Sequence, residues 1–371
     1  MDEASGEPIR VGMVSDGRSD AVDQTIELDV ADAAAAYVNE RRGGIGGRPL
    51  ELVTCETQLD PAKATDCANQ MVEQGVVAVL LGSSGVLEDV WRPLHEAGLP
   101  TVFFAAAGDA VLGDDQSTFV LTNPQGSLLQ VPIDLAESDG ADKVTAVVID
   151  VPPATEGLET NAPRFEEAGL DLELVPIPPG TADMTAQLSD VVGGDPGVVL
   201  VLGNDTFCIS AFQALQALGF DGTVTAVTQC VTDATRDALP EGSLEGIVVG
   251  APVPVGVDDE STELYRAVAD TYGDGIDTSR IAGVGAFVVV AGFAAGLEGL
   301  EGGVTPESII AALRSMPETE LPGAGGLQFR CDGEVMADNP AVCTAGSLTT
   351  TLDADGQPTT YQTADAAPSG G

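Results

Sequence analysis

The sequence predicts an α/β fold made of two consecutive doubly wound, Rossmann-like halves. Short runs rich in β-branched residues alternate with amphipathic helical windows from Ile9 onward, an order typical of mostly parallel sheets. The alternation restarts near residues 122–124, where a second half begins. At 371 residues, the chain is also longer than a single hydrophobic core usually spans.

The elements follow in a regular order. A strand over residues 9–14 leads into a helix whose apolar residues recur close to every 3.6 positions until Gly43 and Gly44 end it. After a strand over residues 50–54, Asp60 and Pro61 predict the N-cap and first turn of the next helix. The remaining strands are expected at residues 76–81, 101–104, 144–149, 172–177, 198–202, 224–227 and 246–249.

The C-terminal third changes character. Residues 258–314 have a helical pattern, and the last part of the chain shows only short strands. The uncharged stretch 281–297 has about 17 residues, marginal for crossing a bilayer, and we predict a buried helix. We expect residues 1–7 and 364–371 to be flexible termini. The start lacks a signal-peptide pattern, which we interpret as a mature chain.

Composition narrows the possible partners. The chain carries 59 acidic against 14 basic residues, for a net charge of -45, which disfavours nucleic acid and keeps the protein soluble. The 44% share of hydrophobic residues is that of a globular protein. We expect a monomer with no nucleic-acid partner.

Six cysteines fall into three close couples, which favours three disulfides and an oxidising compartment. Buried free thiols are the alternative. A zinc site is less well supported, because there is no CxxC motif and His95 is the only histidine. We therefore expect no metal. The couples are Cys55 with Cys67, Cys208 with Cys230, and Cys331 with Cys343.

Doubly wound sheets bind ligands beyond the carboxyl ends of their strands. Polar or small residues at these positions are the candidate contacts, although each could instead form a turn or cap a helix. Few basic residues lie near these ends, which disfavours highly anionic ligands. The candidates are Asp16, Ser83, Ser84, Ala105, Ala106, Ala107, Asp150, Asn204, Asp205, Thr228 and Gln229.

Catalytic signatures are scarce. The sequence contains no GxSxG, HExxH or Walker-type motif, and His95 lies in a helical window without a paired serine motif. We therefore expect that the protein is not an enzyme and that it binds no cofactor. An α/β amidohydrolase or another α/β enzyme without a recognisable motif remains the alternative.

Three segments of the sequence resemble those of a known protein family, both in their order and in their spacing. They are residues 37–52, 60–64 and 98–106. That family is the type 1 periplasmic binding protein family, specifically its branched-chain amino-acid (Leu/Ile/Val) branch of ABC-transporter solute-binding proteins. Ile149 and Asp150 followed by residues 156–158 are a weaker match, and the likeness spans about residues 8 to 330.

The resemblance implies two lobes joined by three crossovers, with one solute trapped between them by hinge closure. Residues 8–122 and about 253–325 would form lobe 1, and residues 123–252 and about 326–363 lobe 2. A membrane permease of an ABC transporter would read the closed form. The protein would be periplasmic, secreted or lipid-anchored, its signal segment removed. A sensor or receptor domain without a transport role is the alternative.

The resemblance also implies site roles. Ser84 stands where the family holds the ligand carboxylate, whereas Ala107, at the second such position, has no side-chain donor. Thr228 or Gln229 stands where the family places the acid that binds the amino group. Gln24 and Ala154 occupy the positions of its aromatic clamp.

A zwitterionic amino acid would then need Asp205 or Asp16 as its anion, because an amide pairs less strongly with an ammonium group than a carboxylate does. We expect a small, weakly charged or neutral solute. Candidates are an amide, a hydrophobic amino acid or an aromatic monocarboxylate.

Overall fold

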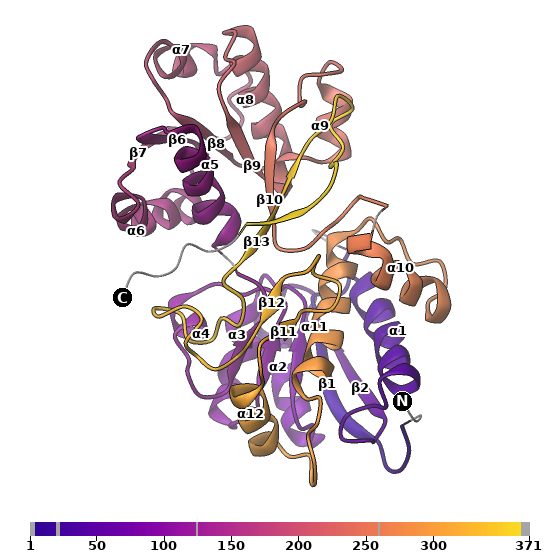
Figure 1. Ribbon diagram of the computed structural model, residues 1–371. Coiled ribbons are helices and arrows are strands. Elements are labelled where there is room, and N and C mark those ends of the chain that lie inside the picture. Colours follow the sequence, from indigo (N-terminus) through magenta and orange to yellow (C-terminus); the bar gives the residue numbers. More distant parts are fainter. Residues whose placement is uncertain (1–3, 20–22, 124, 259, 365–371) are drawn as a thin grey trace. The chain divides into compact units, whose positions relative to one another are not determined.

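The computed structural model describes residues 4–19, 23–123, 125–258 and 260–364 (Figure 1). The chain forms two compact units, each assembled from segments distant in sequence. The first unit comprises Met1–Pro124 and Val253–Gly346, and the second comprises Gln125–Pro252 and Ser347–Gly371. The chain therefore passes between the units three times.

The first unit is built on a five-stranded parallel sheet in the order β2-β1-β3-β4-β5. Gly12 in β1 pairs with Val53 on one side and with Val79 on the other, so β1 is an interior strand. The strands are β1 (Ile9–Ser15), β2 (Leu50–Glu56), β3 (Val79–Leu81), β4 (Thr101–Phe103) and β5 (Thr118–Val120), with a separate hairpin of β11 (Thr319–Glu320) and β12 (Gln328–Phe329).

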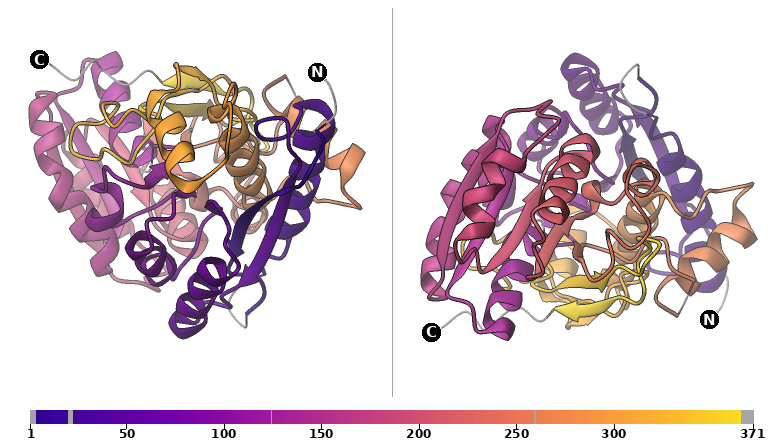
Figure 2. Two further views of the ribbon diagram at one scale, coloured as in Figure 1. Left: turned by 90° about the horizontal axis from the view of Figure 1, so that it is seen from below. Right: turned by 90° about the horizontal axis from the view of Figure 1, so that it is seen from above.

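Helices cover both faces of this sheet. Helices α2 and α3 pack over the core face that contains Val14, Leu81 and Phe103. Helix α11 contacts β3, β4 and α1, and Figures 1 and 2 show the orange helices beside the indigo α1. The helices are α1 (Ile26–Arg41), α2 (Pro61–Glu73), α3 (Leu87–Glu96), α4 (Asp109–Leu112), α10 (Glu260–Tyr272), α11 (Ile281–Gly296) and α12 (Pro306–Ser315).

Two local sequence predictions are confirmed in this unit. The Asp60 side chain caps α2 by accepting hydrogen bonds from the amides of Ala62 at 2.8 Å and Lys63 at 3.3 Å. The uncharged stretch 281–297 forms α11, most of whose residues are buried. Among the described residues, no helix is long and apolar enough to cross a membrane.

The second unit has a seven-stranded sheet in the order β14-β13-β10-β9-β8-β6-β7. The five strands from β10 to β7 run parallel, whereas β13 pairs antiparallel with β10 and β14 pairs antiparallel with β13. The strands are β6 (Lys143–Ile149), β7 (Asp171–Ile177), β8 (Val198–Leu202), β9 (Val224–Val227), β10 (Val248–Ala251), β13 (Ser347–Thr351) and β14 (Gln362–Ala364).

This sheet is also covered by helices on both faces, because two separate core clusters take alternate residues of β6 and β8. The unit begins with a short π-helical turn, η1, that contacts β10 and β13. The helices are η1 (Gly126–Gln130), α5 (Val131–Asp139), α6 (Pro152–Glu167), α7 (Thr185–Gly193), α8 (Asp205–Ala217), η2 (Thr228–Cys230) and α9 (Asp233–Ala238).

The third crossover lies about twenty residues later than expected, between Gly346 and Ser347 and not near residue 326. Segment 326–346 remains in the first unit because Val342 bridges to Val120 and because Arg314 donates to the carbonyls of Cys331 and Pro340, at 3.0 and 3.1 Å. The predicted strands also omitted β5, a strand of three residues that joins the sheet through its pairing with β4.

The expected flexible termini fall partly outside the described residues, at 1–3 and 365–371. The neighbouring residues are held in place and differ from that expectation. The amides of Ala4 and Ser5 donate to the carbonyls of Asn39 and Gly47 at 3.1 and 3.0 Å, and Ala364 pairs with Ser347.

Candidate functional site

The carboxyl edge of the first sheet, called the first edge below, comprises the loops that follow β1, β2, β3 and β4. The strand order changes direction at β1, the place where sheets of this kind bind ligands. There the Ser84 hydroxyl donates to Asp16 Oδ1 at 2.7 Å, and the Gly85 amide donates to Oδ2 at 2.8 Å. The structure thus brings together the predicted residues Asp16 and Ser84.

Asp16 has little capacity left for a ligand. Asp16 is 1% exposed, and the Thr57 hydroxyl donates a third hydrogen bond to its carboxylate, to Oδ1 at 2.6 Å. Ser84 is also used within the protein, since its hydroxyl oxygen accepts the Val86 amide at 3.2 Å. The carboxylate therefore joins the loops after β1, β2 and β3.

Glu27, which sequence analysis missed, lies beneath the same edge. It occupies the first turn of α1, is 0% exposed, and accepts a hydrogen bond from the Ser15 hydroxyl at 2.6 Å. Burial raises the pKa of its carboxyl to about 7, and the Ser15 hydrogen bond opposes this shift. The sequence contains one signal of it: Glu27 shares the 3.6-residue stripe with Val30 and Ala34, so an acid stands on a buried helix face.

The other first-edge candidates divide by exposure. Ser83 and Ala107 are exposed, and Ala105 is half-buried. Ala106 is 6% exposed and packs in the core against α2 and α3, so it does not face solvent as a ligand contact would. The side-chain oxygen of Gln24 is buried and has no hydrogen-bond partner within the described residues.

The second edge comprises the loops after β6, β8 and β9, three neighbouring strands of the second sheet. Asp150 follows β6, and its side chain is exposed, as is that of Gln229 after β9. Asn204 follows β8 and caps α8 by accepting the Phe207 amide at 3.0 Å. The structure therefore places the predicted second-unit residues Asp150, Asn204, Asp205, Thr228 and Gln229 along one edge, with Ala154 in the first turn of α6.

All three expected disulfides are present. Cys208–Cys230 is buried and links the first turn of α8 to the loop after β9, so it joins the two segments that carry Asn204 and Gln229. Cys55–Cys67 links the end of β2 to α2 in the first unit. Cys331–Cys343 closes the segment just before the third crossover.

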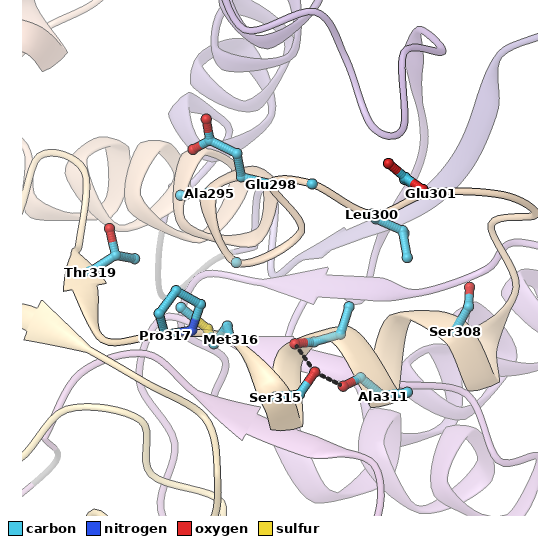
Figure 3. A pocket seen from close by; sticks show the side chains of 13 residues that line it. Ala295, Glu298, Leu300, Glu301, Ser308, Ala311, Ser315, Met316, Pro317 and Thr319 are labelled. Atoms are coloured by element: carbon cyan, nitrogen blue, oxygen red, sulfur yellow. Dashed lines mark hydrogen bonds between the residues drawn. The ribbon is translucent and has the colours of Figure 1, made fainter.

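A hollow of about 580 Å³ lies elsewhere in the first unit, between the end of α11 and α12 (Figure 3). None of the predicted contacts lines it. Two of its polar side chains have partners within the protein: Ser315 donates to the Ala311 carbonyl at 2.7 Å, and Glu298 pairs with Arg42 at 3.1 Å. We therefore place the candidate site at the sheet edges and not in this hollow.

With this geometry in place, comparison with known proteins decides the family. A protein-family sequence model described as "Periplasmic binding protein" matches residues 8–343. The chain belongs to the periplasmic binding protein family. The predicted resemblance is thereby confirmed at the level of the family. A comparison with curated protein sequences found no match.

Solved structures share the fold of this periplasmic binding protein. An ABC transporter substrate-binding protein from Sphaerobacter thermophilus is 20% identical with a TM-score of 0.71, covering 96% of both chains. The branched-chain amino acid transporter substrate-binding protein LivJ from Streptococcus pneumoniae, in complex with isoleucine, is 18% identical with a TM-score of 0.68 over 96% and 99% of the chains. An ABC transporter solute-binding protein from R. palustris, in complex with 4-hydroxybenzoate, is 19% identical with a TM-score of 0.68 over 96% and 97%.

The surroundings of His95 differ from those of a hydrolase base. Its ring stacks on Trp91 with centroids 4.7 Å apart, and both Asp114 Oδ2 and Ser117 Oγ lie 3.4 Å from its Nδ1. A nucleophile–histidine–acid relay needs its two partners on opposite ring nitrogens. Ser117 directly precedes β5, so this group lies at the amino ends of the strands, away from the first edge. Within the described residues, no cluster of His, Cys, Asp or Glu could hold a metal ion.

Proposed function

We propose that this periplasmic binding protein is the solute receptor of an ABC uptake system and traps one small molecule between its two units by hinge closure. The observation that carries the proposal is that each unit presents polar groups at the carboxyl ends of its parallel strands, on loops secured by buried hydrogen bonds or by a disulfide. A solute that contacts both edges only in the closed form would shift the equilibrium by its differential affinity.

The proposed setting follows from the family. The protein would act outside the cell membrane as a monomer, lipid-anchored, secreted or periplasmic, and pass its solute to a membrane permease. A receptor that signals without transport would bind in the same way, and dependence of solute uptake on the permease separates the two roles.

The proposed solute is small and weakly charged or neutral. Among the described residues, the first edge has no excess of positive charge that would favour a polyanion. Arg18 pairs with Asp23 at 2.6 Å, and the carboxylates of Asp16 and Glu56 offset the nearby cations Lys63 and Arg280. Asp150 on the second edge is exposed and suits a solute with an ammonium or amide donor. An amide, a hydrophobic amino acid or an aromatic monocarboxylate meets these conditions. The relatives solved with isoleucine and 4-hydroxybenzoate are compatible with that range.

The first experiment is a thermal-shift screen with L-isoleucine, 4-hydroxybenzoate, primary amides, sugars and citrate, followed by calorimetry on each hit. A true solute at about 100 times its Kd should stabilise the protein by about 2.7 kcal/mol. Recovery of the unchanged compound after incubation supports a receptor, whereas its consumption supports the amidohydrolase alternative. Citrate as the strongest binder would contradict the proposed solute class.

Variants at the two edges then test the site. Ser83→Ala on the first edge and Gln229→Ala on the second should each weaken solute binding about 5- to 50-fold, the loss expected for one or two hydrogen bonds. Matched controls are Ser138→Ala in α5 and Gln187→Ala in α7, both exposed and away from the edges. Equal losses in the site variants and the controls would move the site elsewhere.

A further inference from the structure

Glu27 is a buried carboxyl group whose surroundings suit the neutral acid better than the anion. Within the described part of the chain it forms no ion pair, and its two hydrogen-bond donors are the Ser15 hydroxyl at 2.6 Å and the Ser83 amide at 3.4 Å. The second distance is long for an amide bond. A carboxylate without close donors or a cation is costly to bury.

The hydrogen bonds around Ser15 support the neutral form. The Ser15 hydroxyl has one proton and two acceptors in reach, Glu27 Oε2 and the Gln24 carbonyl at 3.4 Å, while its oxygen accepts the Gly17 amide at 3.0 Å. If Glu27 is ionised, the Ser15 proton goes to the carboxylate, and among the described residues the Gln24 carbonyl keeps only the Glu27 backbone amide as its donor, at 3.0 Å. If Glu27 carries a proton, it can donate to Ser15, and Ser15 can donate to Gln24. A hydroxyl group then makes its full set of one donated and two accepted bonds.

These contacts connect the loops of the candidate site. Ser15 is the last residue of β1 and Gly17 belongs to the loop that follows it, Gln24 lies two residues before α1, and Ser83 belongs to the loop after β3. Gly82 allows the close approach, because a Cβ atom there would lie 2.3 Å from Glu27 Oε1. A change in the charge of Glu27 therefore acts on three segments of the first edge at once.

We propose that Glu27 is a positioning residue of the solute site: as a neutral acid it holds the first-edge loops in their binding conformation, and loss of its proton loosens them. This inference deepens the proposed function and rests on it for its consequence for solute affinity. The raised pKa of Glu27, about 7, places the change near neutrality.

The charged groups around Glu27 act on its pKa in opposite directions, and the acid Asp16 has the larger effect. Asp16 at the end of β1 raises the pKa of Glu27, and Arg280, which precedes α11, lowers it by less. Glu56 at the end of β2 approaches Gly17 and adds negative charge, whereas Tyr265 of α10 stays neutral because burial raises its pKa to about 12. The loop 82–85 carries no titratable side chain.

The test compares wild type with Glu27→Gln and Glu27→Ala between pH 5 and 9. The amide of Gln can donate to Ser15 as the neutral acid would, whereas Ala cannot. The infrared band of the protonated carboxyl group, assigned by its loss in Glu27→Gln, should disappear as the pH passes about 7. Hydrogen exchange of the Gly17 and Ser83 amides, corrected for the intrinsic pH effect, should accelerate over the same range in wild type, remain slow in Glu27→Gln, and be fast throughout in Glu27→Ala.

Solute binding adds a second arm, with L-isoleucine and 4-hydroxybenzoate as probes. If only the protonated form binds, Kd should rise about tenfold between pH 6 and pH 8 in wild type and stay level in Glu27→Gln. A protein that binds neither probe at pH 6 challenges the proposed function alone, because the infrared and exchange measurements need no solute. A carboxyl band absent at pH 5, or amide exchange that ignores its titration, would overturn the role of Glu27.

Discussion

The two sheet edges are held in different ways. At the first edge, Asp16, Glu27 and Ser15 are buried and connect their loops through hydrogen bonds. At the second edge, Asp150 and Gln229 are exposed, and a covalent bond, Cys208–Cys230, joins the loops after β8 and β9. The first edge should therefore respond to removal of a charge or to a change in pH, and the second to removal of its disulfide.

The largest expected effect tests the hydrogen-bonded edge. Asp16→Ala leaves the hydroxyls of Thr57 and Ser84 and the amide of Gly85 without their acceptor, and should lower the free energy of unfolding by about 3–5 kcal/mol. Urea denaturation followed by circular dichroism measures this. The matched change at the second edge, Asp150→Ala, should stay within about 0.5 kcal/mol because that side chain is exposed. Similar losses in both variants would remove the contrast between the edges.

The second prediction concerns the disulfide. Replacing both Cys208 and Cys230 by Ala removes a disulfide between residues 22 positions apart in the sequence. Because the unfolded chain is then less constrained, the second unit should lose about 3 kcal/mol of stability. Hydrogen exchange should show the added opening in the segments that carry Asn204 and Gln229, while the first unit stays protected.

The matched control removes Cys55–Cys67, with a separation of 12, and should affect the first unit instead. If removing either disulfide accelerated amide hydrogen exchange equally in both units, the two units would unfold together and not independently.

The third effect is the pH dependence that Glu27 contributes to stability. Its pKa is about 7 in the folded protein against 4.5 as the ordinary value, so between these pH values the folded state keeps a proton that the unfolded state releases. This contribution to stability is complete below pH 4.5 and is lost as the pH rises to about 7.

Relative to Glu27→Gln, wild type should therefore lose about 3 kcal/mol between pH 4 and pH 8. The difference between the two proteins, measured by urea denaturation at each pH, cancels the titration of the other acids. A constant difference across the range would show that Glu27 has an ordinary pKa.

Local patterns in the sequence were sufficient for most of the secondary structure. The strand before α1, the cap at Asp60 and the buried helix 281–296 depend on neighbouring residues, whose periodicity and capping chemistry are visible in the chain itself. The disulfide partners were also predictable, since each couple is close in sequence. Because carboxyl ends of parallel strands share one edge, the positions of Ser84 and Gln229 followed from the strand pattern as well.

Tertiary structure decided what depends on distant residues. The last crossover lies at Gly346 because segment 326–346 pairs with Val120 and accepts hydrogen bonds from Arg314, contacts that no local pattern records. The roles of Asp16 and Glu27 depend on donors from Thr57, Ser84 and Ser15 and on burial by neighbouring elements. The sequence alone determines that a carboxyl group is present. Its charge, and whether its oxygens can still accept hydrogen bonds from a ligand, depend on the groups that folding brings around it.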